Sequence, residues 1–332
     1  MLFSFLYSIL KNTINQNKMR YFTFLFLIFS QSLFSQTIQI FDPLDSKKNM
    51  NLFMEIGIDE YGNKWLATMN SGLIKYNGKE FEFYNESNSE IKGNSTGPIY
   101  VDSKGNIWIS YFNREKLLYG FVKYDGRTWT KNFNGINLNS TSKMIEDSKG
   151  NIYFAQKRKL IIFDGKNWSN INYPKGNYPT RSLAVDSNGT IAIGHHYGLL
   201  IKKKNVWQSY KLDKSEVYSI PSALCFDQNG NLFIGYYGNG DIGFSILDTN
   251  GHWQHFSTFN SDLPSNSIRD IKMDELGNLW MCSDDGLVKY TNGEIISYNL
   301  RKDYDENFLY YLAIEDNTIW ITSCFGLIKF NE

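Results

Sequence analysis

The sequence has 332 residues, of which 16% are aromatic and 20% are charged. So many aromatic residues at modest charge exclude a disordered chain. Basic and acidic residues balance at 34 each without a basic stripe, which argues against nucleic acid as a partner. The three cysteines, Cys225, Cys282 and Cys324, lack metal-ligand spacing. We expect buried free thiols, with a Cys282–Cys324 pairing as the alternative.

The beginning of the chain has the layout of a secretory signal peptide. Residues 19–35, MRYFTFLFLIFSQSLFS, combine a short basic start, an apolar run and small polar residues near Ser35. The apolar run is shorter than the about 20 residues that a membrane span requires. We predict a signal peptide over residues 1–35, cleaved near Ser35, with Met19 as an alternative start and an uncleaved anchor as the competing interpretation. No membrane span is expected in the mature chain.

A motif that begins with an acidic residue recurs along the rest of the chain. It reads DSKGNIW from Asp102, DSKGNIY from Asp147 and DELGNLW from Asp274, with a large residue six positions after each Asp. Asp can accept hydrogen bonds from turn amides and Gly tolerates positive φ, so the motif predicts a hairpin turn rather than a catalytic carboxylate. Seven copies recur at spacings of 39 to 47 residues, anchored at Asp59, Asp102, Asp147, Asp186, Asp227, Asp274 and Glu315.

Each copy predicts four short antiparallel strands. An alternating apolar stretch ends at the Asp, and a second strand carries the large residue. A third strand often follows a Gly-Leu pair, as at Gly72-Leu73, and a fourth carries aromatic residues, as in FEFY at 81–84. Four strands in about 40 residues are typical of a propeller blade. No window of comparable length has helical periodicity.

The two ends of the chain complete one blade between them. The last copy stops at LIKFNE, residues 327–332, and lacks a fourth strand. The segment TIQIF, residues 37–41, lies as far before Asp59 as the fourth strand of the first copy lies before Asp102. Pairing this segment with the last copy leaves no sheet edge open within the ring. The expected fold is an all-β, seven-bladed propeller over residues 36–332, closed by its N-terminal strand.

The consensus, roughly D-x-x-G-N-x-W-I followed by G-L-x-K-Y-(D/N)-G and an aromatic pair, resembles the two-component regulator propeller repeat. The third copy departs from it at Lys159, the fourth at Thr190 and Ala192, and the seventh lacks the turn Gly. In that family, such propellers are the extracytoplasmic sensing part of bacterial signalling proteins, which commonly continue into a membrane helix and a histidine kinase. The resemblance implies a secreted or periplasmic sensor linked to two-component signalling, without the kinase part.

Ligands are expected at the face that carries the loops between second and third strands and the connections between blades. These loops are uneven and rich in aromatic and charged residues, which suits a sugar or a peptide because apolar faces stack while a few polar groups orient the ligand. The predicted partner is a small ligand or oligosaccharide, or a membrane signalling protein. The candidate residues are Tyr111, Arg114, His195, His196, Tyr236, Tyr237, Asp284 and Phe325.

Two further signals are interpreted as structural. GNGDIG, residues 238–243, matches a dinucleotide fingerprint, but a strand follows where that motif requires a helix. His195 and His196 are adjacent in a predicted strand and point to opposite faces, which disfavours a metal site. We predict no cofactor, no metal and no catalytic residue. The alternatives are a propeller enzyme, such as a lyase or glycan-cleaving enzyme using one of these histidines as a base, or a protein-interaction scaffold.

Overall fold

The computed structural model describes residues 36–43, 52–174, 176, 178–212, 216–238, 240–300, 309–324 and 326–332. The predicted signal peptide and the candidate Phe325 lie outside these residues. The described chain forms strands β1 to β28 and contains no helix. It therefore also contains no helix that could cross a membrane.

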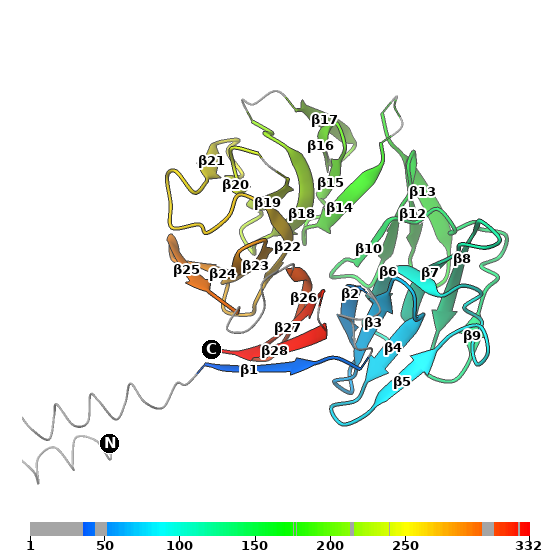
Figure 1. The fold of residues 1–332 in the computed structure, drawn as a ribbon. Coiled ribbons are helices and arrows are strands. Elements are labelled where there is room, and N and C mark those ends of the chain that lie inside the picture. The colour runs from blue at the N-terminus through cyan, green and yellow to red at the C-terminus, as the bar shows by residue number, and fades with distance from the viewer. Residues whose placement is uncertain are drawn as a thin grey trace, which may run out of the picture.

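The strands form seven four-stranded antiparallel sheets arranged in a ring, which we call blades 1 to 7 (Figure 1). Blade 1 contains β2 (Phe53–Ile58), β3 (Lys64–Thr68), β4 (Leu73–Tyr76) and β5 (Phe81–Tyr84), and blade 2 contains β6 (Ser95–Val101), β7 (Ile107–Asn113), β8 (Leu118–Tyr124) and β9 (Trp129–Thr130). Blade 3 contains β10 (Lys143–Glu146), β11 (Ile152–Ala155), β12 (Lys159–Phe163) and β13 (Trp168–Asn172), and blade 4 contains β14 (Thr180–Val185), β15 (Ile191–His195), β16 (Gly198–Lys203) and β17 (Val206–Lys211). Blade 5 contains β18 (Ile220–Phe226), β19 (Leu232–Tyr237), β20 (Phe244–Leu247) and β21 (Trp253–Phe256), and blade 6 contains β22 (Ile268–Met273), β23 (Leu279–Ser283), β24 (Gly286–Thr291) and β25 (Glu294–Tyr298). Blade 7 contains β26 (Leu309–Glu315), β27 (Thr318–Ser323), β28 (Gly326–Asn331) and β1 (Thr37–Phe41).

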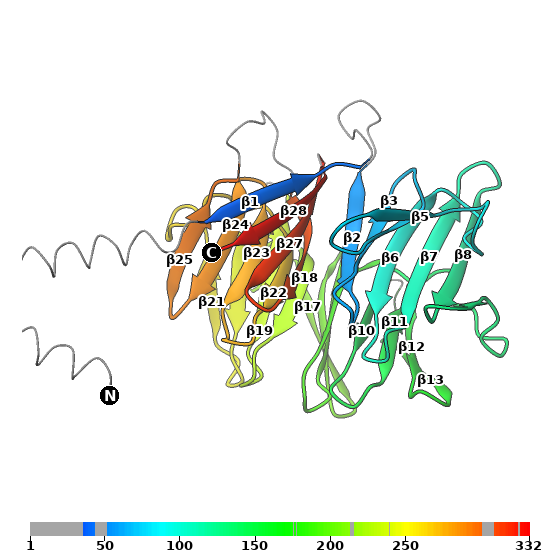
Figure 2. The ribbon, with the colours of Figure 1, turned by 90° about the horizontal axis from the view of Figure 1, so that it is seen from below.

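The seventh blade is closed by the two ends of the chain, as the sequence predicts. β1 pairs antiparallel with β28 over the register Thr37↔Asn331 to Phe41↔Leu327, and the blue and red strands lie side by side in Figures 1 and 2. The Phe41 ring packs 5.1 Å from the Tyr76 ring of blade 1. The closing strand therefore also contributes to the contact between blades 7 and 1.

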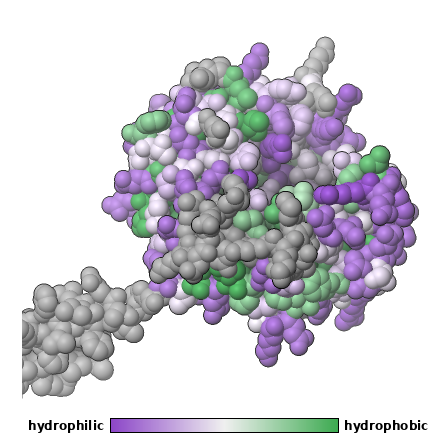
Figure 3. Space-filling view, viewed as in Figure 1, coloured by the Kyte–Doolittle hydropathy of each residue, from purple (hydrophilic) through white to green (hydrophobic). Residues whose placement is uncertain are grey.

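The ring has two distinct faces, because the first strand of every blade is the innermost and all first strands run the same way. In the side view of Figure 2, the strands run from one face of the ring to the other. At one end, which we call the turn face, lie the hairpins between first and second strands. At the other end, the connection face, the chain passes between blades and the loops between second and third strands lie. Figure 3 shows mainly hydrophilic residues around the rim of the ring, with hydrophobic residues among them.

The core is divided among the blade interfaces. Seven clusters of buried side chains are found in the described chain, each joining neighbouring blades. Between blades 2 and 3, for example, Trp108 packs against Phe133 and Phe154 at ring distances of 5.7 and 5.2 Å. Each fully buried side chain of this size contributes roughly 1.5–3 kcal/mol. The ring is thus stabilised by contacts between repeats, as expected when no repeat can bury its own faces.

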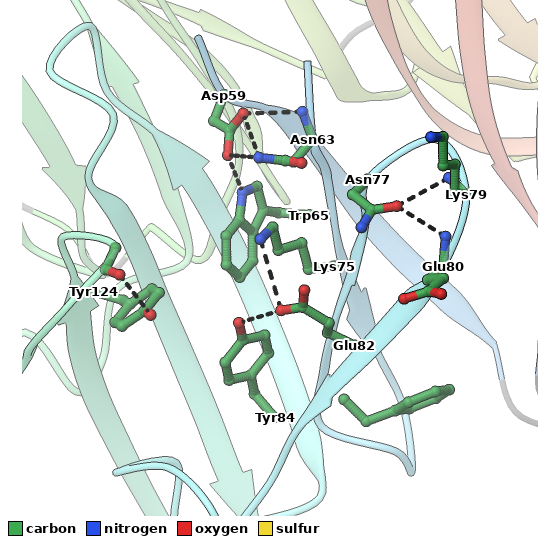
Figure 4. Close-up of polar contacts among 12 residues, drawn as sticks. Asp59, Asn63, Trp65, Lys75, Asn77, Lys79, Glu80, Glu82, Tyr84 and Tyr124 are labelled. Carbon is green, nitrogen blue, oxygen red and sulfur yellow. Dashed lines mark hydrogen bonds and ion pairs between the residues drawn. The ribbon is translucent and has the colours of Figure 1, made fainter. Parts of the chain in front are cut away.

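The repeated Asp of each turn has the hairpin role that the sequence predicts. Asp59 Oδ1 accepts hydrogen bonds from the backbone N–H groups of Tyr61 and Asn63 at 3.0 and 2.9 Å. Its Oδ2 also accepts from Trp65 Nε1 at 2.8 Å (Figure 4). The six-residue spacing from Asp to the large residue therefore has a physical cause, which is one carboxylate bonding both turn and strand. Equivalent bonds join Trp108 to Asp102, Tyr153 to Asp147, Trp280 to Asp274 and Trp320 to Glu315.

Candidate functional site

Six inner strands begin with an irregular register. The breaks fall between Phe53 and Ile56, Thr96 and Ile99, Thr180 and Ser182, Pro221 and Ala223, Ile268 and Asp270, and Leu309 and Leu312. Such a β-bulge leaves a residue out of the ladder and re-aims its side chain. The residues released in this way are Met54, Glu55, Gly97, Pro98, Arg181, Ser222, Arg269, Tyr310 and Tyr311.

All of these bulge residues line one pocket at the connection face. The pocket has a volume of about 590 Å³ and receives residues from all seven blades, including Lys143 of blade 3 and Tyr237 of blade 5. We call it the mouth pocket, because it opens above the channel that the inner strands enclose. A pocket of this size accommodates a ligand of several hundred daltons.

A largely buried ion pair lies where the mouth pocket meets the channel. Lys143 Nζ lies 2.5 Å from Glu55 Oε1, and both side chains are less than a fifth exposed. The ammonium also lies 4.5 Å from the centre of the Tyr311 ring. Burial by itself would lower the pKa of Lys143, but the Glu55 carboxylate, with Tyr311 and Asp270, raises it above its ordinary value. Lys143 is therefore held in its charged form.

Asp270 is a second buried carboxyl in the same channel. Its Oδ2 accepts a hydrogen bond from the Leu312 N–H of blade 7 at 3.1 Å, and its Oδ1 lies 3.9 Å from Lys272 Nζ. Burial raises the pKa of Asp270, and the positive charges of Lys272 and Lys143 oppose that shift. Desolvation thus outweighs the nearby cations.

Arg269 lies between two tyrosine rings at the edge of the mouth pocket. Its guanidinium carbon is 4.5 Å from the Tyr237 ring centre and 5.3 Å from the Tyr310 ring centre. Arg269 Nε donates to Asp284 Oδ1 at 2.7 Å. Stacking and the ion pair together fix two tyrosines from blades 5 and 7 beside the pocket. Tyr237 is 45% exposed and so presents part of its surface to solvent.

A histidine orients the second arginine of the mouth pocket. Arg181 Nε donates to His196 Nε2 at 2.8 Å, so that ring nitrogen must be unprotonated. Burial and the charge of Arg181 lower the pKa of His196. The neighbouring His195 is turned into the protein, where it lies 4.5 Å from the Tyr178 ring. Burial lowers the pKa of His195 to about 4, with a smaller contribution from His196.

The structure brings three of the predicted residues to the mouth pocket. Tyr237 lines it, while Asp284 and His196 hold the two arginines that line it. The other described candidates lie elsewhere. His195 and Tyr236 are buried.

Tyr111 packs over Gly120, where a Cβ would come within 2.0 Å of the Tyr111 ring. Arg114 is exposed on the β7–β8 loop. The ligand role of these candidates stays a prediction.

Sequence reasoning missed the residues of the inner strands, namely Glu55, Lys143, Arg181, Arg269, Asp270, Tyr310 and Tyr311. A signal was present, because each is polar, charged or aromatic near the start of an otherwise apolar alternating strand. Glu55, Lys143, Asp270 and Tyr311 all stand four positions before the acidic anchor of their copy. Equal register in a ring places such residues in one layer around the axis.

Other candidate chemistry is sparse in the described part of the chain. No group of three or more His, Cys, Asp or Glu side chains there could hold a metal ion. None of the three cysteines forms a disulfide in the described chain, so the alternative Cys282–Cys324 pairing is absent. A separate cavity of about 500 Å³ at the turns of blades 6 and 7 is lined by Asp274 and Trp280, which already bond each other.

One family description matches the sequence. The two component regulator propeller matches residues 262–285, which contain β22, its turn and β23. No curated protein gives a significant match.

Solved structures show the same fold at low identity. Virginiamycin B lyase from Staphylococcus aureus has a TM-score of 0.67 and 13% identity, covering 90% of this chain and 100% of that chain. YCF48 bound to D1 peptide has a TM-score of 0.64 and 12% identity, covering 89% and 94%.

The extracellular domain of the hybrid two component system BT4673 from B. thetaiotaomicron has a TM-score of 0.66 and 15% identity. That match covers 89% of this chain and 40% of the other, so this chain spans about two fifths of its length. The chain is thus a seven-bladed β-propeller, of which residues 262–285 match the two component regulator propeller repeat.

Proposed function

We propose that this propeller is a non-catalytic, extracytoplasmic sensor that binds an oligosaccharide in the mouth pocket. The observation that carries the proposal is the convergence of six β-bulges from different blades on one pocket. A bulge sacrifices ladder hydrogen bonds, and a purely architectural ring has no need to repeat that loss at one end. The ligand's presence would be passed to a membrane signalling protein, the kind of partner that the repeat family implies.

The residues of the mouth pocket suit a saccharide. Tyr237 and Tyr310 offer aromatic faces beside charged groups. Ser222 donates its hydroxyl proton to the Ile268 carbonyl at 2.6 Å, so its oxygen can act only as an acceptor. Aromatic faces stack on sugar rings while polar groups orient hydroxyls. The extracellular domain of BT4673 shares this fold, and the matched repeat is that of two-component regulators. Both support placing the protein outside the cytoplasm, where such ligands are met.

The arrangement of charge favours binding over catalysis. Lys143 and Arg269 are each engaged by a carboxylate. His195 is 2% exposed and lies against Tyr178, so it offers no accessible base. General acid–base catalysis needs a group within reach of the substrate and with a pKa near the working pH. The lyase fold match is the reason to retain an enzyme as the alternative.

Calorimetric titration with a panel of purified oligosaccharides tests the proposal. The panel contains neutral hexasaccharides of glucose, xylose and mannose, and uronate oligosaccharides. We expect at least one to bind, and Tyr237→Ala and Tyr310→Ala to weaken it by about tenfold each, as expected for loss of an aromatic contact. Tyr61→Ala is the control, because Tyr61 is 81% exposed on the turn face.

The same incubations separate the alternatives. Chromatography of the bound sugar should return it intact, and cleavage products would favour the enzyme. Failure of every sugar to bind, together with retention of a protein from the same source on immobilised propeller, would favour the scaffold. Equal effects of Tyr61→Ala and Tyr237→Ala would remove the mouth pocket as the site.

A further inference from the structure

The mouth pocket has one more positive than negative side-chain contact, and the unbalanced charge is that of Arg181. Its basic side chains are Lys143, Arg181 and Arg269. Glu55 balances Lys143 and Asp284 balances Arg269. The hydrogen-bond partner of Arg181 is the neutral ring of His196. The pocket therefore contains one guanidinium whose charge is not matched by a carboxylate contact in the described chain.

Arg181 is placed by the backbone as well as by its histidine. It is the residue left unpaired by the bulge between Thr180 and Ser182, at the start of β14, and its side chain is exposed. A neutral imidazole that accepts from Nε fixes the plane of the guanidinium without neutralising it. A bond through Nε occupies one edge of the fork and leaves the pair of Nη groups for another partner. Such a pair matches a carboxylate in two parallel hydrogen bonds.

Arg269 differs from Arg181, because its partner is a carboxylate and not a neutral imidazole. There an aspartate occupies Nε and two tyrosine rings flank the guanidinium, so the cation serves to order aromatic surface. The pocket thus offers a charged fork on blade 4 and stacking surfaces on blades 5 and 7. A ligand that uses both must combine sugar rings with an anionic group.

We propose that the ligand is an acidic oligosaccharide, and that Arg181 binds the carboxylate of a uronic acid residue while its rings stack on Tyr237 and Tyr310. The inference rests on the proposed function and narrows it to one class of saccharide. His196 is then a positioning residue, because it holds the guanidinium and does not itself contact the ligand.

Paired ligands test the inference. Tetrasaccharides of galacturonate, guluronate and hyaluronan are titrated beside their carboxyl-reduced counterparts, which keep the linkage and lose the charge. We expect at least one acidic sugar to bind ten times or more tightly than its reduced form. Arg181→Gln should abolish that preference and leave the affinity for the reduced form unchanged. Arg181→Lys, which keeps the charge without the fork, should restore part of it.

Matched variants distinguish a specific role of Arg181 from a general loss of positive charge or of stability. Arg127→Gln removes an exposed arginine on the β8–β9 turn, at the turn face, and should keep the full preference. His196→Ala should weaken acidic sugars alone, with unchanged thermal midpoint. A preference that survives Arg181→Gln would overturn the inference, and so would equal binding of acidic and reduced sugars, although the latter leaves the proposed function intact. Absence of binding for every pair overturns both.

Discussion

Lys143 of blade 3 and Glu55 of blade 1 form an ion pair between two blades that are separated in the ring by blade 2. Nζ and Oε1 are 2.5 Å apart, although the residues are 88 positions apart in sequence. At the equivalent position blade 2 has Pro98, which carries no charge. The second oxygen of Glu55 accepts from the Ile99 N–H of blade 2 at 2.9 Å. One carboxylate therefore joins three blades around the channel.

Removing the cation of this pair should be costly. Lys143→Met leaves Glu55 buried without a counter-charge, for which we expect a loss of about 3–5 kcal/mol in the free energy of unfolding. Denaturation by urea measures it. Lys131→Met is the matched control, because Lys131 pairs with Glu90 at 3.0 Å on the surface, and it should change stability little.

The double variant Glu55→Gln/Lys143→Met should recover most of that loss, since it leaves no buried charge. Urea midpoints that are as low for the double variant as for Lys143→Met would show that packing, and not charge, dominates at this position.

The buried His195 should make stability depend on pH. Its folded-state pKa of about 4 lies below the ordinary value of 6.5, so the unfolded chain binds more protons between those values. Stability should therefore fall as the pH falls from 6.5 to 4, by up to about 3 kcal/mol. His195→Phe should lose this part of the pH dependence, whereas replacing His252, exposed beside Asp248, should keep it. Parallel pH profiles for wild type and His195→Phe in urea denaturation would contradict the assignment.

The turn carboxylates should differ in importance between blades. Asp102→Ala leaves the Trp108 indole N–H, on a residue 2% exposed, without its acceptor. Among the described residues, the Asp186 carboxylate bonds only the turn amides of Asn188 and Thr190, because Ala192 stands at the indole position of its blade. We expect Asp102→Ala to reduce stability by about 1–3 kcal/mol more than Asp186→Ala. Equal shifts in the urea midpoint would mean that the indole bond contributes nothing.

Closure of the ring should be a large contribution to stability. A chain that begins at Asp42 lacks β1 and exposes the edge of β28 together with the surface that Phe41 covers, so its melting temperature should fall well below that of a chain beginning at Gln36. Phe41→Ala alone should cost about 3 kcal/mol. Thr37→Ala, at the outer end of the same strand, serves as the control. A chain without β1 that melted at the parent temperature would contradict closure by this strand.

The fold could be predicted from sequence because its determinants are local and repeated. Asp102, the turn Gly and Trp108 lie within seven consecutive residues, and their hydrogen bonds need no distant partner. Repetition at a regular period then fixes the number of blades, and the missing fourth strand at Asn331 points to Thr37. These features depend on interactions between residues a few positions apart, which can be recognised directly in the sequence.

The mouth pocket could not be predicted from the sequence, because it forms only in the tertiary structure. A bulge shifts Arg181 or Arg269 out of its ladder, and local alternation cannot show where such a shift occurs. Tyr236 and Tyr237 are equally plausible as sequence, but strand pairing buries the first and presents the second to the pocket. Glu55 meets Lys143 only because the ring closes and brings inner strands of different blades around one axis. The distances between inner-strand residues of different blades depend on the closed ring, and no single repeat determines them.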